Sequence, residues 1–390
     1  MSIRLRNARI AGELRDLHLA GGRIVEAHPC RAEIDLDGRV VVPGFVDAHC
    51  HLDKTLWSGP WVPNTAGSDL AEKIAYTREG RSRWGVPSAP RITELLRTMV
   101  AAGTTRVRTH TDVSPEFGLD GFEAVAEATA SLGGLVDVEQ VAFPQYGLLS
   151  NPGTVALVDI ALSEGLAQVV GGIDPVGVDG DADRHLETVF ELAVRHGVPV
   201  DIHLHDHDEL GRRELDMIIE RTLQAGLQGR VTVSHCYALA EATGAEQIEQ
   251  IARLASADIA LTTCAAHNDP LAPVRALASA GVRLGLGSDG IRDLWSPWGN
   301  GDLLERAHQL AYRNAFDSDP DIAHALFLAT AGGAAVLGVD DHGTEVGDVA
   351  DLVVLDSRSE AEAVVTRASR HLVFKRGVLV ARDGVLTSDL

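Results

Sequence analysis

Residues 45–51 of the chain read FVDAHCH, and they give the strongest indication of the fold. A short apolar segment of this kind is typical of a buried strand. His49 and His51 stand at its end, two positions apart. Side chains two apart on a strand point in the same direction. The stretch therefore predicts a strand that presents two imidazoles together from its carboxyl end.

Seven further apolar segments follow, with helical patterns between most of them. We expect them to form strands near residues 104–111, 135–143, 167–173, 199–205, 231–236, 257–263 and 282–288. An alternation of strands and helices favours parallel strands, and eight such units favour a closed barrel. The sequence therefore predicts an α/β fold, a (β/α)8 TIM barrel over residues 45–338.

The two ends of the chain carry a different pattern. Residues 3–6 and 17–19 have strand-like alternation, and a Gly21-Gly22 turn follows them. Strand patterns return after about residue 338, in residues 350–355 and 372–380. We therefore expect one small β-sandwich domain, discontinuous in sequence, formed by residues 1–44 and 339–390 together.

Composition limits the class of protein. The chain has 390 residues, 45% of them hydrophobic, which is enough for a sizeable core. Its formal net charge of -22 disfavours a nucleic-acid partner. No apolar run is long enough to cross a membrane, and the charged N-terminus does not resemble a signal peptide. The four scattered cysteines form no CxxC pair, so we expect reduced thiols and a cytoplasmic location.

Polar residues follow the expected strands at their carboxyl ends. His203 closes the fifth strand, His235 closes the sixth, and Asp289 follows the eighth. In a (β/α)8 barrel these ends form the active-site face, where His49 and His51 also lie. Imidazoles and a carboxylate converging there suit a divalent metal such as zinc or iron. A metal of this kind lowers the pKa of bound water towards ~7 and so creates a nucleophile, while the acid can take a proton.

The motifs around these residues resemble a known family. Residues 43–54, PGFVDAHCHLDK, resemble the opening motif of the amidohydrolase superfamily. Residues 107–110 (VRTH), 141–145 (VAFPQ) and 233–235 (VSH) are similar to its cytosine deaminase branch, and residues 343–355 resemble its small sheet domain.

This resemblance implies a ligand set. One metal would be bound by His49, His51, His203 and Asp289, and His235 would contact the hydrolytic water or the departing group. Binuclear members carry a carboxylated lysine at the end of the fourth strand, and residues 169–174 (VVGGID) contain none. We therefore expect one divalent metal ion per chain.

The family pattern changes after the fifth strand. Asp206 stands where the cytosine deaminase branch carries a proton-shuttling glutamate. It can act as a general acid/base if the substrate lies close, or it can cap the helix that begins near Asp208. The aspartate and the HLDK run of residues 51–54 resemble triazine-degrading isopropylaminohydrolases of the same superfamily. That resemblance implies proton transfer and water positioning by His235 and Lys54, although Lys54 could instead be a surface lysine.

Two further positions match substrate-binding residues of the family. Gln145 matches a glutamine that hydrogen-bonds the ring edge, a task suited to an amide that donates and accepts. Trp295 matches a tryptophan that packs on the flat base, although most tryptophans serve ordinary packing. Gly290 stands where cytosine deaminase has a second aspartate, which puts cytosine itself in doubt as the substrate.

The sequence thus predicts a metal-dependent hydrolase that removes ammonia or an amine from a small nitrogen heterocycle. A metal-bound hydroxide attacks a ring carbon, with His235, Asp289, Asp206 and Lys54 as the catalytic residues. Two alternatives use the same site, a triazine-type N-alkylamine hydrolase and a cyclic amide hydrolase. A non-catalytic metal-containing binding protein is the alternative from another class. We expect a small-molecule substrate, no membrane partner and a homo-oligomer.

Overall fold

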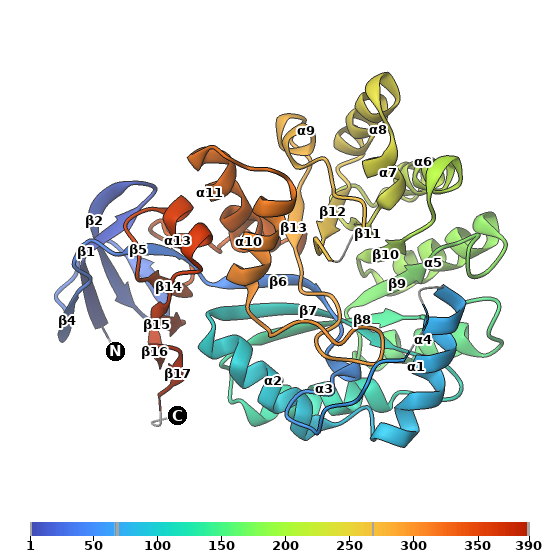
Figure 1. Cartoon of the computed structure of the whole chain (residues 1–390), viewed down its shortest axis with the longest axis horizontal. Coiled ribbons are helices and arrows are strands. Elements are labelled where there is room, and N and C mark those ends of the chain that lie inside the picture. Colours follow the sequence, from blue (N-terminus) through green and yellow to red (C-terminus); the bar gives the residue numbers. More distant parts are fainter. Residues whose placement is uncertain (1, 66, 68–69, 267–268, 388–390) are drawn as a thin grey trace.

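The computed structural model describes residues 2–65, 67, 70–266 and 269–387. Its centre is an eight-stranded sheet in which every neighbouring pair of strands is parallel (Figure 1). The strands in order are β6 (Phe45–Cys50), β7 (Thr104–Asp112), β8 (Asp137–Phe143), β9 (Val169–Ile173), β10 (Val200–Leu204), β11 (Val231–His235), β12 (Ala260–Thr263) and β13 (Leu284–Leu286). All eight predicted barrel strands are therefore present.

The last and first strands of this sheet meet and nearly close the barrel. The backbone N–H of Asp289 donates to the carbonyl oxygen of His49 at 2.9 Å, and Asp289 pairs with Cys50 in an isolated parallel bridge. β13 is shorter than the predicted 282–288. The reason lies just beyond it, where the N–H of Ser288 donates to the carboxylate of Asp47 at 2.9 Å instead of extending a ladder.

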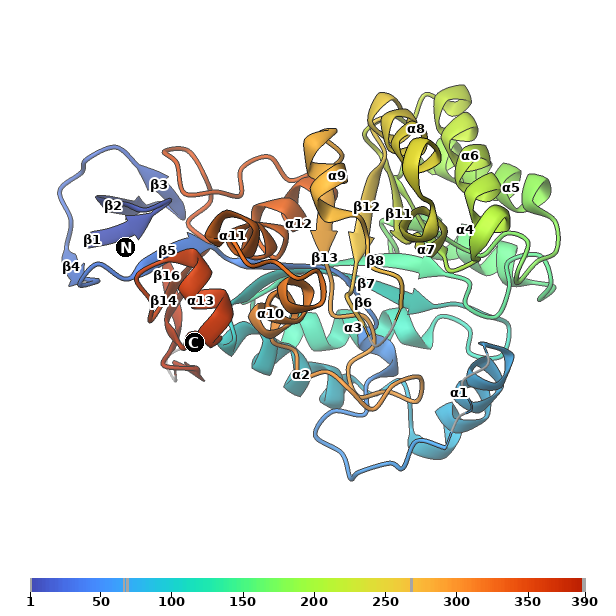
Figure 2. The ribbon, with the colours of Figure 1, turned by 45° about the horizontal axis from the view of Figure 1, so that its top comes forward.

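Amphipathic helices cover the outside of the barrel (Figure 2). The helix α5 (Ala182–His196) shows why they form. Its N-cap Asp181 accepts a hydrogen bond from the N–H of Arg184, and Gly197 ends it in a left-handed conformation. Its buried side chains recur at three- and four-residue intervals, as one face of a helix requires.

The remaining helices alternate with the strands or follow them. They are η1 (Leu52–Lys54), α1 (Leu70–Trp84), α2 (Ala89–Ala101), α3 (Asp120–Ser131), α4 (Thr154–Ser163), α6 (Asp208–Ala225), α7 (Tyr237–Glu241), α8 (Gly244–Ser256), α9 (Val274–Ser279), α10 (Leu303–Arg313), α11 (Asp319–Leu328), α12 (Ala331–Val336) and α13 (Glu360–Thr366). Within the described ranges, no helix is both long and apolar enough to cross a membrane.

Both ends of the chain build a second sheet beside the barrel (Figure 1). The antiparallel pairing of β5 with β14 joins the N-terminal strands to the C-terminal ones. The strands are β1 (Ser2–Ile10), β2 (Glu13–Ala20), β3 (Arg23–Val25), β4 (Ala32–Asp35), β5 (Val40–Pro43), β14 (Leu352–Leu355), β15 (Arg370–Lys375), β16 (Val378–Arg382) and β17 (Val385–Leu386).

The side-chain alternation of β14 explains how this sheet attaches to the barrel. Leu352 and Val354 lie in a separate hydrophobic core of the terminal sheet. Val353 and Leu355 point the other way and belong to the large core around the barrel. Because successive strand side chains face opposite sides, one strand serves both cores. This shared packing positions the start of β6, and with it the first histidines of the site.

Candidate active site

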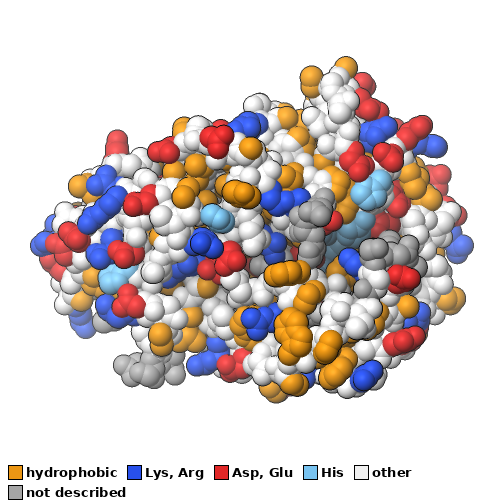
Figure 3. Space-filling view, viewed as in Figure 1, with side chains coloured by type: hydrophobic (Ala, Val, Ile, Leu, Met, Phe, Trp, Pro, Cys, Tyr) orange, Lys and Arg blue, Asp and Glu red, His pale blue; other side chains and the backbone are white. Residues whose placement is uncertain are grey.

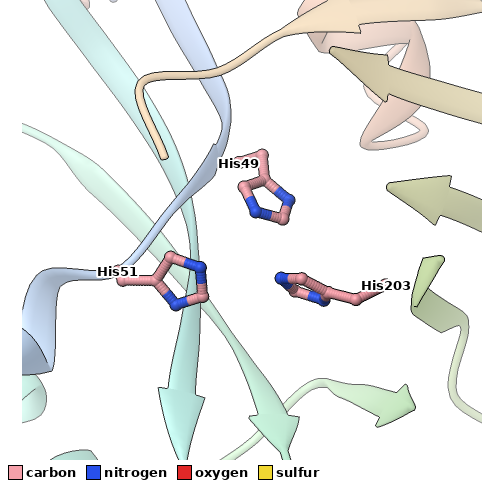
Figure 4. Close-up of side chains that lie close together, drawn as sticks. All are labelled: His49, His51 and His203. Atoms are coloured by element: carbon pink, nitrogen blue, oxygen red, sulfur yellow. The ribbon is translucent and has the colours of Figure 1, made fainter. Parts of the chain in front are cut away.

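Five side chains gather at the carboxyl ends of the barrel strands. His49 and His51 come from the end of β6, and the ligand atoms of His49, His51 and His203 lie within 4.8 Å of one another (Figure 4). Asp289 lies beside them, with its Oδ1 3.3 Å from Nε2 of His51 and 3.8 Å from Nε2 of His49. The ligand atoms of His235, His49 and Asp289 form a second group, and they also lie within 4.8 Å of one another.

Hydrogen bonds fix the protonation of the His49 ring. Its Nδ1 lies 3.0 Å from Oγ of Ser234, and that hydroxyl donates its proton to Asp201 at 2.7 Å. The Ser234 oxygen must therefore accept from Nδ1–H of His49. Nε2 is left with its lone pair, which is the form that binds a metal.

The other two histidines of the cluster are also ready to accept a cation. Nδ1 of His51 lies 3.0 Å from the carbonyl oxygen of His110, which can only accept, so Nε2 again carries the lone pair. Nε2 of His49 and both ring nitrogens of His203 are buried without a hydrogen-bond partner in the described part of the chain. Buried polar atoms are seldom left unsatisfied, so these residues fit a divalent metal ion.

The electrostatics of the cluster agree with this donor set. Burial and the neighbouring histidines hold the pKa values of His49 and His203 well below the usual range. Burial opposes ionisation of Asp289, but the nearby rings of His51, His235 and His49 hold its pKa well below normal. The cluster thus offers neutral imidazoles and an ionised carboxylate, the forms that coordinate metals.

Two of these residues occupy unusual backbone conformations. His235 has a φ of 68° and Asp289 a φ of 60°, both in the left-handed region that non-glycine residues rarely adopt. Such conformations concentrate at functional sites, where the surrounding structure holds them in place. Both residues belong, with His49, to a group whose ligand atoms could hold a metal ion.

A carboxylate–imidazole pair next to His235 was missed from the sequence. Asp174, just after β9, lies 2.8 Å from Nδ1 of His205. The His205 ring stacks on His235, with 4.6 Å between ring centroids. Burial disfavours the charged form of His205, but the charge and hydrogen bond of Asp174 raise its pKa. The HxH spacing of His203 and His205 was the available signal, because residues two apart on a strand share a face.

Asp206 lies at the cavity wall but is engaged with a neighbouring loop. Its Oδ2 accepts a hydrogen bond from the N–H of Gly177 at 2.9 Å. Glu214 lies on its other side, and burial together with Asp206 raises the pKa of Glu214 to about 8. The helix-capping alternative is wrong, since His207 is the N-cap of α6 and the N–H of Asp208 at that end donates to the Glu241 carboxylate at 2.9 Å.

Lys54 is buried inside the site, so the surface-lysine alternative is wrong. It is 4% exposed, its Nζ lies 3.1 Å from Oδ1 of Asp112, and it donates a hydrogen bond to Oε1 of Gln145. Arg81 holds the other oxygen of Asp112 at 2.6 Å. An ammonium has three donors, so Lys54 keeps one hydrogen for a ligand in the cavity.

The cluster opens into a cavity of about 810 Å³. Gln145, Trp295 and Phe143 are among its lining residues, and Trp295 is partly exposed. Nζ of Lys73 lies 5.5 Å from the Trp295 ring centroid, so this tryptophan also carries a cation–π contact. Figure 3 shows histidine side chains within a hollow of the surface, beside acidic ones. The cavity volume suits a small ring with its substituent.

The barrel and the histidine–aspartate cluster together define the class of protein. The chain belongs to the Amidohydrolase family, which it matches over residues 32–129 and 86–386. The protein is therefore a hydrolase that acts on carbon–nitrogen bonds, as its characterised relatives are.

A curated relative and two solved structures are similar to this chain over nearly its whole length. The chain is 33% identical to N-isopropylammelide isopropyl amidohydrolase of Pseudomonas sp. (strain ADP), with 98% of each chain covered. It is similar to the crystal structure of N-isopropylammelide isopropylaminohydrolase from Burkholderia multivorans, at 38% identity and a TM-score of 0.95, covering 99% of this chain and 100% of the other. It also resembles 5-methylcytosine deaminase from Klebsiella pneumoniae liganded with 5-fluorocytosine, at 26% identity and a TM-score of 0.86, covering 100% and 99%.

Proposed function

We propose that this enzyme hydrolytically removes an alkylamine from a small nitrogen-rich ring of the triazine type, such as N-isopropylammelide. The observation that carries the proposal is the cluster of His49, His51, His203 and Asp289 at the floor of a ring-sized cavity beside His235. The similarity to two isopropylammelide hydrolases favours the triazine ring. Water replaces the amine, and the ring carbon becomes a carbonyl.

One divalent metal, zinc or iron, is the cofactor we propose. Bound by His49, His51, His203 and Asp289, it would supply Lewis acidity that makes water a nucleophile at neutral pH. Asp289 is ionised and accepts a proton. Burial and the neighbouring His205 lower the pKa of His235 to about 3, so this imidazole is neutral. It can orient the attacking water and hydrogen-bond the oxygen of the tetrahedral adduct.

Three other residues that line the cavity would hold the ring: Gln145, Lys54 and Trp295. The Gln145 carbonyl oxygen is occupied by Lys54, so its amide N–H groups remain to donate to a ring carbonyl or ring nitrogen. Lys54 offers its third hydrogen to the same edge. Trp295 provides an apolar face for a flat ring. The leaving nitrogen departs as the amine once it has gained the proton that the attacking water gave to Asp289.

A second candidate is deamination of a pyrimidine. The similarity to 5-methylcytosine deaminase and the position of Gln145 in the cavity favour it. Cyclic amide hydrolysis uses the same chemistry but opens the ring. Metal-quantified enzyme should therefore be offered N-isopropylammelide, cytosine, 5-methylcytosine and a cyclic ureide, with released amine and ammonia measured and products weighed by mass spectrometry. Isopropylamine release with an intact ring supports the proposal. Turnover confined to the ureide contradicts it.

Substitution can show whether Lys54 or Asp206 transfers protons in the reaction. Lys54→Met should lower kcat by about 100-fold or more, the usual range for loss of a catalytic proton-transfer group. Asp206→Asn should be mild, within about tenfold, because the asparagine oxygen can still accept from Gly177. The matched control is Lys375→Met, a buried lysine bonded to Asp351 outside the cavity. It should lower stability and leave kcat unchanged. A severe Asp206→Asn variant would make Asp206 the shuttle instead.

Gln145→Leu should leave the polar edge of the substrate ring without its hydrogen-bond partner. The lost hydrogen bonding costs about 1–3 kcal/mol, which corresponds to roughly a tenfold to hundredfold lower kcat/KM. Steady-state kinetics on the best substrate of the panel measure it. The control is Gln250→Leu, a buried glutamine on α8 that hydrogen-bonds the backbone of Arg212, and it should leave kcat/KM unchanged. Wild-type efficiency in Gln145→Leu would remove Gln145 from the binding surface.

A further inference from the structure

The loop after β13 contains a buried carboxylate that the mechanism above does not use. Asp293 is 4% exposed and lines the cavity. Its Oδ1 accepts hydrogen bonds from the N–H groups of Trp295 at 2.9 Å and Ser296 at 2.7 Å. Its Oδ2 has no hydrogen-bond partner among the residues that the structure describes. A buried carboxylate oxygen without a donor is costly, so a donor from a bound molecule would satisfy it.

Gly290 provides the space for this oxygen. A Cβ at position 290 would lie 2.3 Å from Oδ2 of Asp293 and 3.0 Å from its Cγ. The carboxylate cannot simply turn away, because Oδ1 is held by two backbone N–H groups. The glycine is not needed for its backbone, since its φ is not among the positive values of the chain. Gly290 is therefore required for room, and any side chain there would displace Oδ2.

The surroundings of Asp293 favour a donor rather than an acceptor as its ligand. Burial raises the pKa of Asp293 to about 6, and the charge of Lys54 limits that rise. The carboxyl already accepts two backbone N–H bonds through Oδ1, so the side chain is engaged as a hydrogen-bond acceptor. Gln145 and Lys54 line the same cavity and present donors. The cavity thus offers both donors and an acceptor, which matches a ring edge where carbonyl and N–H groups alternate.

We propose that Asp293 is a specificity-determining residue whose Oδ2 accepts a hydrogen bond from an N–H group of the substrate ring. The inference rests on the proposed function, because it requires a nitrogen heterocycle in this cavity. It adds a selection rule to that function. Rings with an N–H at this edge are accepted, and rings methylated at nitrogen are rejected.

Equilibrium binding to the zinc-loaded protein tests the rule without turnover. The probes are cyanuric acid, which presents ring N–H groups between carbonyls, and its tri-N-methyl derivative, which keeps the carbonyls and has no N–H. Calorimetry should show tighter binding of cyanuric acid to the wild type. Asp293→Asn keeps an oxygen for the Trp295 and Ser296 N–H groups and places an NH2 at Oδ2. It should weaken cyanuric acid binding by about 10- to 100-fold, the range for losing one hydrogen bond to a charged group.

Gly290→Ala is a second variant that leaves position 293 untouched. It should weaken cyanuric acid binding as Asp293→Asn does, because the new methyl group takes the place of Oδ2. In both variants the affinity for the tri-N-methyl ring should change by less than threefold or so, since that ring makes no bond to Oδ2. The control is Asp216→Asn, which removes the same charge from α6 and should bind both rings like the wild type.

Several results would overturn the inference. For the variants, these are an unchanged cyanuric acid affinity in Asp293→Asn, an equal loss of affinity for both rings in that variant, or a Gly290→Ala protein that binds like the wild type. For the wild type, they are equal affinity for the two rings or no binding of either. Melting temperatures near that of the wild type show that the loop is intact. If discrimination is present but no ring in the panel is turned over, the proposed function fails and the binding rule stands.

Discussion

Substitution of His203 by alanine is expected to remove both metal and activity. His203 is buried, and both of its ring nitrogens lack a partner within the described ranges. Loss of an outer-shell residue commonly costs 10–100-fold in metal affinity or activity, so loss of a direct ligand should cost more than about 100-fold. Elemental analysis of protein purified without added metal should find close to one equivalent in the wild type and far less in His203→Ala.

The control for this variant is a buried histidine outside the cluster. His185 lies on α5 with its Nδ1 2.6 Å from Asp179, and His185→Ala should lower stability without loss of metal. A His203→Ala protein with full metal and full activity would remove His203 from the ligand set. Two equivalents of metal in the wild type would contradict a mononuclear site.

Substitution of His235 by asparagine should abolish turnover while leaving the metal bound. The His235 ring lies at the centre of the site, 4.8 Å from the ring of His49 between centroids. Its low pKa leaves it neutral, so it can orient the attacking water and hydrogen-bond the oxygen of the adduct. Asparagine is shorter and cannot hold the water and the adduct oxygen at the same positions, so kcat should fall by about 10²- to 10³-fold. The KM should change much less, because ring contacts remain.

Metal content and kinetics measured on one preparation distinguish a catalytic role of His235 from a role as a metal ligand. His342→Asn is the matched control, because His342 is buried but hydrogen-bonds the carbonyl of Gly44 at the base of the terminal sheet. It should retain kcat. An active His235→Asn enzyme with intact metal would contradict the proposed mechanism. Loss of metal in that variant would instead make His235 a ligand.

Much of the fold could be predicted from local patterns in the sequence. The strand at Phe45–Cys50 and its seven successors were predicted because a barrel strand is a short apolar run at a regular interval. The position of His203 and His235 at strand ends placed them on one face of the barrel, since all parallel strands end there. These conclusions depend on chain order and periodicity alone.

The hydrogen-bond partners of the polar side chains could not be predicted from the sequence in the same way. Lys54 contacts Asp112 and Gln145, which are 58 and 91 positions further along the chain, so its burial depended on the packing of loops. Asp206 was expected either to serve the chemistry or to cap a helix, but its carboxylate bonds the Gly177 N–H across the end of β9. Sequence spacing does not report contacts between neighbouring loops.

The barrel, the order of its strands and the set of side chains at their carboxyl ends follow from the sequence, because strand period and parallel connection are local properties. The task of each side chain there depends on how distant elements pack together. Ser234 fixes the His49 tautomer, Asp174 holds His205 against His235, and the space at Gly290 accommodates an oxygen of Asp293 that has no donor among the described residues. The physical reason is that hydrogen-bond partners and free volume arise between elements distant in the chain, where a shift of one ångström changes which atoms meet.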